Sequence, residues 1–235
     1  PTIVRTMLKS EGCRSPYAAI GSFCLVTRIP LVLLLRRRAP DAAAAGSPGS
    51  RPVQPISISP AALQVLLVIA GLGCCVAMSM PQVHIVAYCM DLGYGIAHGA
   101  DMLSIMMAAG VVSRLASGFI ADRIGGAKTL VIGSVLQCLS LLFYIPFDGL
   151  ASLYVVSLVF GLSQGGIVPC YAIIVREYLP AKEAGQRIGI VMMATIFGMA
   201  IGGWMSGRVF DLTRSYARAF LQWIAWDFLE IMASG

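Results

Sequence analysis

Long apolar runs set the first constraint on this chain. Seven segments are each close to the length that an α-helix needs to cross a bilayer, about 20 residues at a rise of ~1.5 Å per residue. They are residues 17–35, 61–86, 101–120, 129–147, 150–175, 188–209 and 216–233. Lipid offers no partner for backbone N–H and C=O groups, and the runs are too long and too uniformly apolar for barrel strands. The sequence therefore predicts an all-α membrane protein, a bundle of about seven transmembrane helices in the lipid bilayer.

The composition agrees with this prediction and excludes several other classes of protein. Of the 235 residues, 58% are hydrophobic and 12% are charged, whereas a soluble domain carries about 25% charged residues. Too little polar surface remains for a soluble enzyme or a disordered chain. The net charge of +6 would suit nucleic acid, but the basic residues lie between the apolar runs, which is typical of membrane topology. We therefore expect no nucleic-acid partner.

The sequence also lacks the patterns that catalytic and metal sites require. It contains no P-loop, no pairing of a nucleophile with a base and no metal-ligand spacing. Its seven cysteines lie mostly inside apolar runs, where they behave as small hydrophobic residues. We therefore expect neither an enzyme nor a bound metal or cofactor.

Residues 36–60 differ sharply from the runs on either side. The stretch contains five prolines, an alanine run and four arginines, a composition typical of a flexible polar linker. We expect it to separate residues 1–35 from a transmembrane bundle formed by residues 61–235. A cleaved signal peptide is the alternative interpretation of the first run, but Arg28 and Pro30 interrupt its apolar stretch.

Lysine and arginine counts in the loops predict the orientation. Alternate loops form two groups, and the group that includes the linker carries nine basic residues against three in the other group. Because basic loops stay in the cytoplasm, we expect the linker on the cytoplasmic side. The three basic residues on the opposite side, Arg208, Arg214 and Arg218, all come near the start of the last run and depart from this rule.

A short motif follows the third run at its cytoplasmic end. The stretch GFIADRIGGAK contains Gly118, Asp122, Arg123, Gly125 and Lys128. Gly118 is expected to allow close helix approach, and Gly125 a sharp turn. Asp122 lies at a helix C-terminus, where a carboxylate is unfavourable, so it should pair with Arg123 or with a nearby helix N-terminus. Such a charged latch can break and re-form as two bundles move; an ordinary basic turn is the alternative.

This motif resembles the loop signature G-x-x-x-D-R-x-G of the major facilitator superfamily, except at Ala127, where a basic residue is usual. The stretches MPQVHIVAYCMDLGYG, SRLASGFIADRIGG, GLSQGGIVPCYAIIVREYLP and FDLTRSY are similar to the C-terminal half of bacterial carriers in the monocarboxylate and oxalate/formate branch. The resemblance implies that residues 1–35 are an outer loop and the last helix of a missing N-terminal bundle, which would be a partner of residues 61–235. It also implies secondary active transport of a small organic anion by alternating access, with a proton or by exchange, in the bacterial inner membrane.

Arg114 is the first candidate for contact with a substrate. It lies 13 residues after Asp101 and 8 before Asp122, so it is ~20 Å and ~12 Å from the two ends of its run and within the membrane. Residues at spacings of three and four share its helical face: Gly110, Ser117, Gly118 and Ala121. This small and polar stripe should face protein or water. There, a guanidinium can hold a carboxylate through two parallel hydrogen bonds; a fixed acidic partner is the alternative. The resemblance agrees, because related carriers place a substrate-binding arginine at this point of the eighth helix.

Three further residues are candidates for hydrogen bonds to a substrate. His84 and Tyr88 share a helix face near the outer end of the second run, and His84 could carry a proton. Hydrogen bonding between helices is the alternative for both. Gln164 lies mid-run among glycines and near Pro169. Pro81 predicts a kink or a break in the second run, a feature that often borders carrier sites.

Two other sequence patterns carry expectations about packing and the cytoplasmic surface. Glycine pairs at a spacing of four predict close helix contacts: Gly161/Gly165, Gly198/Gly202 and Gly203/Gly207. The mixed-charge run from Arg176 to Arg187 favours a solvated loop, and a salt-bridged gate against a second bundle is the alternative.

The cargo and the function both have alternatives. The sixth run has no lysine or arginine before Arg208, and a single cation at Arg114 favours a monocarboxylate over a dicarboxylate. An efflux carrier for drugs or other hydrophobic compounds is the alternative within the same superfamily. A truncated remnant without transport is a third possibility, because Asp227 and Glu230 in the last run would together cost ~5 kcal/mol if they faced lipid instead of protein.

Overall fold

The computed structural model describes residues 14–35, 58–180, 182–213, 224, 226 and 230–232. Every element within these ranges is a helix and none is a strand, so the all-α prediction is confirmed. The helices are α2 (Arg14–Leu35), α3 (Pro60–Asp91), α4 (Ile96–Ile124), α5 (Gly126–Phe143), α6 (Leu150–Gln164), α7 (Ile167–Tyr178) and α8 (Ala184–Thr213).

Five helical segments are long and apolar enough to cross a membrane. They are α3, α4, α5, the stretch Leu150–Tyr178 that contains α6 and α7, and α8. These segments coincide with the second to sixth predicted runs. The apolar part of α2, Gly21–Leu33, is helical as predicted but shorter than the five spans.

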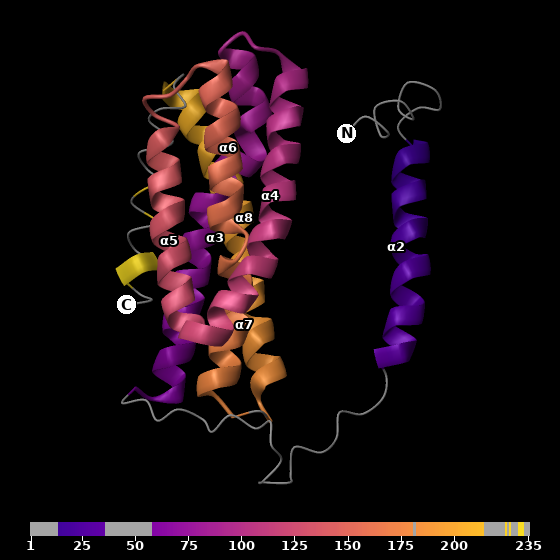
Figure 1. The fold of residues 1–235 in the computed structure, drawn as a ribbon, viewed down its shortest axis with the longest axis vertical. Helices are drawn as coiled ribbons and strands as arrows, with labels where there is room; N and C mark the ends of the chain where they lie inside the picture. The colour runs from indigo at the N-terminus through magenta and orange to yellow at the C-terminus, as the bar shows by residue number, and fades with distance from the viewer. Residues whose placement is uncertain are drawn as a thin grey trace. The chain divides into compact units, whose positions relative to one another are not determined.

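The chain divides into two compact units, Pro1–Arg51 and Pro52–Gly235. The division falls inside the predicted linker, of which only Ile58, Ser59 and Pro60 belong to the described residues. Among the described residues, the first unit contributes helix α2, drawn in indigo in Figure 1. The assignment of the two units to two bundles of a carrier stays a prediction.

Helices α3 to α8 form one bundle within the second unit, with their long axes roughly aligned (Figure 1). The most extensive contact is between α3 and α8, followed by that between α4 and α6. Large side chains such as Met80, Phe160 and Tyr171 are fully buried between the helices. This packing holds the middle of α3 and of α6–α7 in place and leaves α4 and α8 the least covered spans.

Two of the three predicted glycine pairs lie at close helix contacts. A Cβ at Gly161 or Gly165 would clash with the backbone of α4, and a Cβ at Gly198 or Gly202 would clash with the backbone of α3. The third pair, at positions 203 and 207, leaves ordinary room for a Cβ. The first two pairs therefore explain why α6 lies so close to α4, and α8 to α3.

The helix break in this bundle is at a different place from the one that the sequence indicated. Helix α3 runs without interruption through Pro81, so the break predicted as one possibility there is wrong; Pro81 is buried in the most extensively packed helix. The fifth run, expected as one helix, is instead divided into α6 and α7 by Gly165 and Gly166. Both glycines lie against α4, where a Cβ would clash.

The last predicted run lies mostly outside the described residues, and Asp227 is among those not described. Ile224, Trp226 and the three residues from Glu230 are helical. Glu230 is fully buried and bonded to side chains of α5 and α7. This acidic residue therefore faces protein, which removes the cost that a lipid-facing carboxyl would carry.

Candidate functional site

A cavity of about 340 Å³ lies within the bundle, large enough for a small organic molecule. Its walls come from α3, α4, the junction of α6 and α7, and α8. The lining residues are Cys75, Met78, Gln82, Met107, Gly110, Val111, Arg114, Gln164, Val168, Thr195, Ile196 and Met199. Four of these side chains, Gln82, Arg114, Gln164 and Thr195, can hydrogen-bond strongly through nitrogen or oxygen, and the surrounding wall is largely apolar.

Arg114 is an exposed residue well inside α4, nearer to the end of the helix than to its start. It lies 18 residues after the start of the helix and 10 before its end, about 27 Å and 15 Å along the axis. Its Nε donates a hydrogen bond to the carbonyl oxygen of Gly165 at 3.3 Å. No acidic side chain in the described part of the chain pairs with it, so the alternative of a fixed acidic partner is not observed there.

The carbonyl that Arg114 meets is left over by the helix break. In a continuous helix the Gly165 oxygen would accept the N–H of residue 169. Residue 169 is a proline, which has no N–H, and it lies in the first turn of α7, where proline is tolerated. The Gly-Gly-x-x-Pro pattern thus both ends α6 and presents a backbone acceptor to the arginine.

The stripe predicted around Arg114 faces protein over most of its length. Gly110, Ser117 and Ala121 are buried against neighbouring helices. Gly118 differs, because a Cβ built there would meet no atom within 4 Å. Among the described residues, no helix approaches Gly118, so the close approach predicted at this glycine is not observed.

Two glutamines close one side of the cavity. Gln82 Nε2 on α3 donates a 2.6 Å hydrogen bond to Gln164 Oε1 at the end of α6. Gln164 is buried, and a Cβ at Gly110 would lie 3.6 Å from its Nε2. The structure therefore brings together Arg114 and Gln164, two of the residues that the sequence indicated, with Gln82 and Thr195 on the same wall.

His84 and Tyr88 do not line this cavity. The Nε2 atom of His84 lies 3.0 Å from the carbonyl oxygen of Gly203 on α8, the hydrogen bond between helices that was one of its two expected roles. Tyr88 is buried one turn further along α3. A role for either residue in substrate binding remains a prediction that the cavity does not support.

The loop motif forms the corner between α4 and α5. Gly125 has a φ of +91° and joins the two helices directly, which confirms the predicted sharp turn. Asp122, Arg123 and Lys128 are exposed around this corner. That these charged residues form contacts that break and re-form as two bundles move stays a prediction.

A carboxylate that the sequence analysis did not single out meets the helix N-terminus at this corner. Glu177 Oε2, near the end of α7, accepts the backbone N–H of Gly126 at 3.1 Å. An anion at this end of α5 is favoured because the first N–H groups of a helix have no helical partner. Glu177 belongs to the mixed-charge run after Val175, which the sequence did single out. Its partner Gly126 could not be foreseen, because the two residues are 51 positions apart in sequence.

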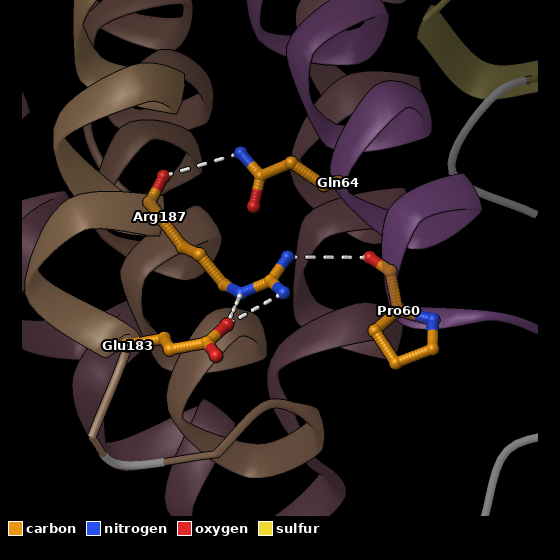
Figure 2. Close-up of polar contacts among 4 residues, drawn as sticks. All are labelled: Pro60, Gln64, Glu183 and Arg187. Atoms are coloured by element: carbon orange, nitrogen blue, oxygen red, sulfur yellow. Dashed lines mark hydrogen bonds and ion pairs between the residues drawn. The ribbon is translucent and has the colours of Figure 1, made fainter.

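The far end of the same mixed-charge run is bonded within the bundle (Figure 2). Arg187 forms an ion pair with Glu183 at 2.7 Å, and its Nη1 donates to the carbonyl oxygen of Pro60 at 3.5 Å. Gln64 Nε2 in turn donates to the Arg187 carbonyl oxygen at 3.2 Å. These bonds join the first turns of α3 and α8, so this part of the run is more than the solvated loop that the sequence favoured.

Comparison with known proteins decides the family. The model described as "Major Facilitator Superfamily" matches residues 1–203 of this chain. The chain belongs to the major facilitator superfamily. As members of this superfamily are transporters that cross the membrane many times, the predicted multi-pass, non-enzymatic membrane protein agrees with the match.

The relatives of this major facilitator chain include anion carriers and exporters. Monocarboxylate transporter 13 of Rattus norvegicus is 28% identical over 144 residues, 60% of this chain and 34% of the relative. Probable anion transporter 5 of Arabidopsis thaliana is 28% identical over 113 residues, 47% of this chain and 26% of the relative. Multidrug export protein EmrB of Haemophilus influenzae is 23% identical over 123 residues, 51% of this chain and 24% of the relative. The chain thus spans about a third or less of the length of the relatives that it matches.

Proposed function

We propose that this chain is part of a secondary carrier that moves a small organic anion, of the monocarboxylate type, across the membrane by alternating access. The observation that carries the proposal is the position of Arg114 on the cavity wall, at mid-depth in α4 and without an acidic partner in the described residues. An arginine in such surroundings is stabilised by an anion, and its planar guanidinium suits the two oxygens of a carboxylate.

The charge of the cavity favours a single carboxylate. Arg114 is the one lysine, arginine or histidine on the described wall, and no aspartate or glutamate lies there. Gln82, Gln164 and Thr195 supply neutral hydrogen-bonding groups for a hydroxyl or carbonyl of the same molecule. The remaining wall, rich in methionine and aliphatic side chains, suits a short apolar chain.

Alternating access needs a second bundle on the other side of the cavity. In the most apolar stretch of α4 only 28% of the residues are buried, and in that of α8 only 22%. The corresponding share is 44% to 61% in the other spans. Exposed apolar side chains flank the cavity on these helices, among them Leu115 and Ile196. Because the relatives are about three times as long as the matched region, we propose that a further bundle of the carrier covers this face. We place the carrier in the bacterial inner membrane, with the linker in the cytoplasm and with a proton or an exchanged anion as the coupling partner.

A drug exporter is the second candidate, because proteins named as exporters are among the relatives. The apolar lining of the cavity would suit hydrophobic cargo equally well. Only the charge of Arg114 separates the two candidates, since a neutral hydrophobic compound gains nothing from a guanidinium.

The deciding experiment is a transport assay with three classes of cargo. Cells that express the complete gene, and cells without it, are supplied with a labelled monocarboxylate, a labelled dicarboxylate and a lipophilic cationic dye. The proposal expects accumulation or exchange of the monocarboxylate above the control cells. Dye extrusion without any carboxylate movement would replace the proposal by the exporter.

A further inference from the structure

Glu230 is the one acidic or basic side chain that is fully buried in the described part of the chain. It belongs to the last helical segment and lies among three helices of the bundle. This position is not part of the cavity at Arg114, and the proposed transport does not use it.

Two hydroxyl groups fix one oxygen of this carboxyl group. Ser134 Oγ on α5 lies 2.6 Å from Glu230 Oε1 and 2.9 Å from the Leu130 carbonyl oxygen, so its single hydroxyl proton is shared between these two acceptors. The Tyr171 hydroxyl on α7 donates to the same carboxyl oxygen at 3.1 Å. The second oxygen, Oε2, is buried and accepts no hydrogen bond among the described residues. The carboxyl group thus has one well-bonded oxygen and one unsatisfied oxygen.

The groups around Glu230 would not compensate a negative charge on its carboxyl group. From α3 the Cys74 thiol faces the carboxyl, from α7 the Tyr171 phenol, and from α5 the Ser134 hydroxyl. No described lysine, arginine or histidine pairs with the carboxyl. A buried carboxylate without a cation is far more costly than a neutral carboxylic acid.

We propose that Glu230 is a proton-binding site in the core of this bundle, with the proton on Oε2 and the carbonyl oxygen Oε1 held by Ser134 and Tyr171. A neutral carboxyl group matches this bonding pattern, because Oε1 accepts two hydrogen bonds while Oε2 carries the proton. The assignment holds whatever cargo the carrier moves, so it stands or falls independently of the proposed function.

The site and the cavity lie on two sides of the same turn of α3. Cys74 faces Glu230, while its neighbour Cys75 lines the cavity. The ring of Tyr171 and the side chain of Thr195, a cavity residue, both lie beside Gly71, where a Cβ would be 3.8 Å and 3.2 Å from them. Loss of the proton would place a charge on the carboxyl that Tyr171 contacts, and Tyr171 borders the same glycine as the cavity residue Thr195.

Infrared difference spectroscopy tests the protonation state directly. The full chain is measured in lipid nanodiscs at neutral pH, where exposed carboxyl groups are ionised. We expect the C=O stretch of a carboxylic acid, which Glu230→Gln removes and the control Glu183→Gln leaves unchanged. Glu183 is the matched control because it is exposed and paired with Arg187.

A second variant provides an independent measurement if Glu230→Gln fails to fold. Tyr171→Phe removes one hydrogen bond to Oε1, so the acid band should move to higher frequency without loss of intensity. The proposal is overturned if neutral-pH spectra contain no acid band that either variant changes, because Glu230 would then be ionised.

Discussion

Replacement of Arg114 by alanine should abolish carboxylate transport while leaving the bundle folded. A guanidinium holds a carboxylate through two charge-assisted hydrogen bonds, each worth ~1.5–3 kcal/mol. Their loss removes ~3–6 kcal/mol, and at about 1.4 kcal/mol per tenfold the uptake rate at low substrate should fall by ~100-fold to ~10,000-fold. Arg114→Lys keeps the charge but loses the parallel pair, so we expect an intermediate loss of ~10-fold to ~100-fold.

The same substitution should have little effect on stability, because two terms oppose each other. Alanine loses the bond from Nε to the Gly165 carbonyl, a contribution of ~1.5–3 kcal/mol for a charged donor. It also removes a charge from mid-bilayer depth, which costs ~2.5–3.5 kcal/mol on insertion scales. The melting temperature of the purified variant should therefore stay close to that of the wild type.

The assay measures initial uptake of a labelled monocarboxylate in cells that produce equal amounts of each variant. Arg176→Ala is the matched control, since Arg176 is an exposed arginine in the last turn of α7 and away from the cavity. Uptake by Arg114→Ala at the rate of the control would refute the assigned role, as would a loss of uptake fully explained by unfolding.

Five further substitutions at four positions test the packing and the corner between α4 and α5, each followed by thermal unfolding in detergent. Gly161→Ala should destabilise the bundle by ~1–3 kcal/mol because its Cβ would clash with the backbone of α4. By contrast, Gly118→Ala has open space and should gain up to ~1 kcal/mol of helix propensity; equal effects would contradict the helix contact. Gly125→Ala should cost ~1–3 kcal/mol because its φ of 91° and ψ of 159° form a conformation that is essentially restricted to glycine, and an unchanged melting temperature would argue against that conformation. Glu177→Ala should cost ~0.5–2 kcal/mol by removing the acceptor for the Gly126 N–H, whereas Glu177→Gln should retain part of it.

The five central spans could be predicted from sequence because lipid leaves the backbone no alternative to helix over such long apolar runs. The depth of Arg114 followed from the same reasoning, since a helix converts residue number into distance. Helix interruptions could not be predicted as well. Pro81 gives a strong local signal, yet tertiary packing keeps α3 continuous, and the actual break at Gly165–Gly166 depends on a close contact with α4.

Polar partners that lie far apart in sequence were the part of the site that sequence reasoning missed. His84 and Gln164 were both candidate cavity residues by position, but packing turns His84 toward the carbonyl of Gly203 and Gln164 toward Gln82. The contact between Glu177 and the N-terminus of α5 was missed for the same reason, because its two partners are far apart in sequence. Periodicity shows which face of a helix is polar, but the neighbour that meets it is decided by the fold.

The arginine and the helix break depend on each other. Arg114 is tolerated at mid-depth partly because the Gly165 carbonyl accepts its Nε, and that carbonyl is available because Pro169 cannot donate to it. A carbonyl compensates for lost hydration but supplies no negative charge, so the guanidinium still gains by meeting an anion. The bond also uses Nε alone, and no described residue accepts from the two Nη groups, which are the ends of the fork that a carboxylate would engage. A structural arginine would be expected to have its charge neutralised and its donors used within the bundle. Among the described residues Arg114 has no acidic partner and uses only its Nε within the bundle, and this difference is the strongest physical reason for assigning it to a substrate.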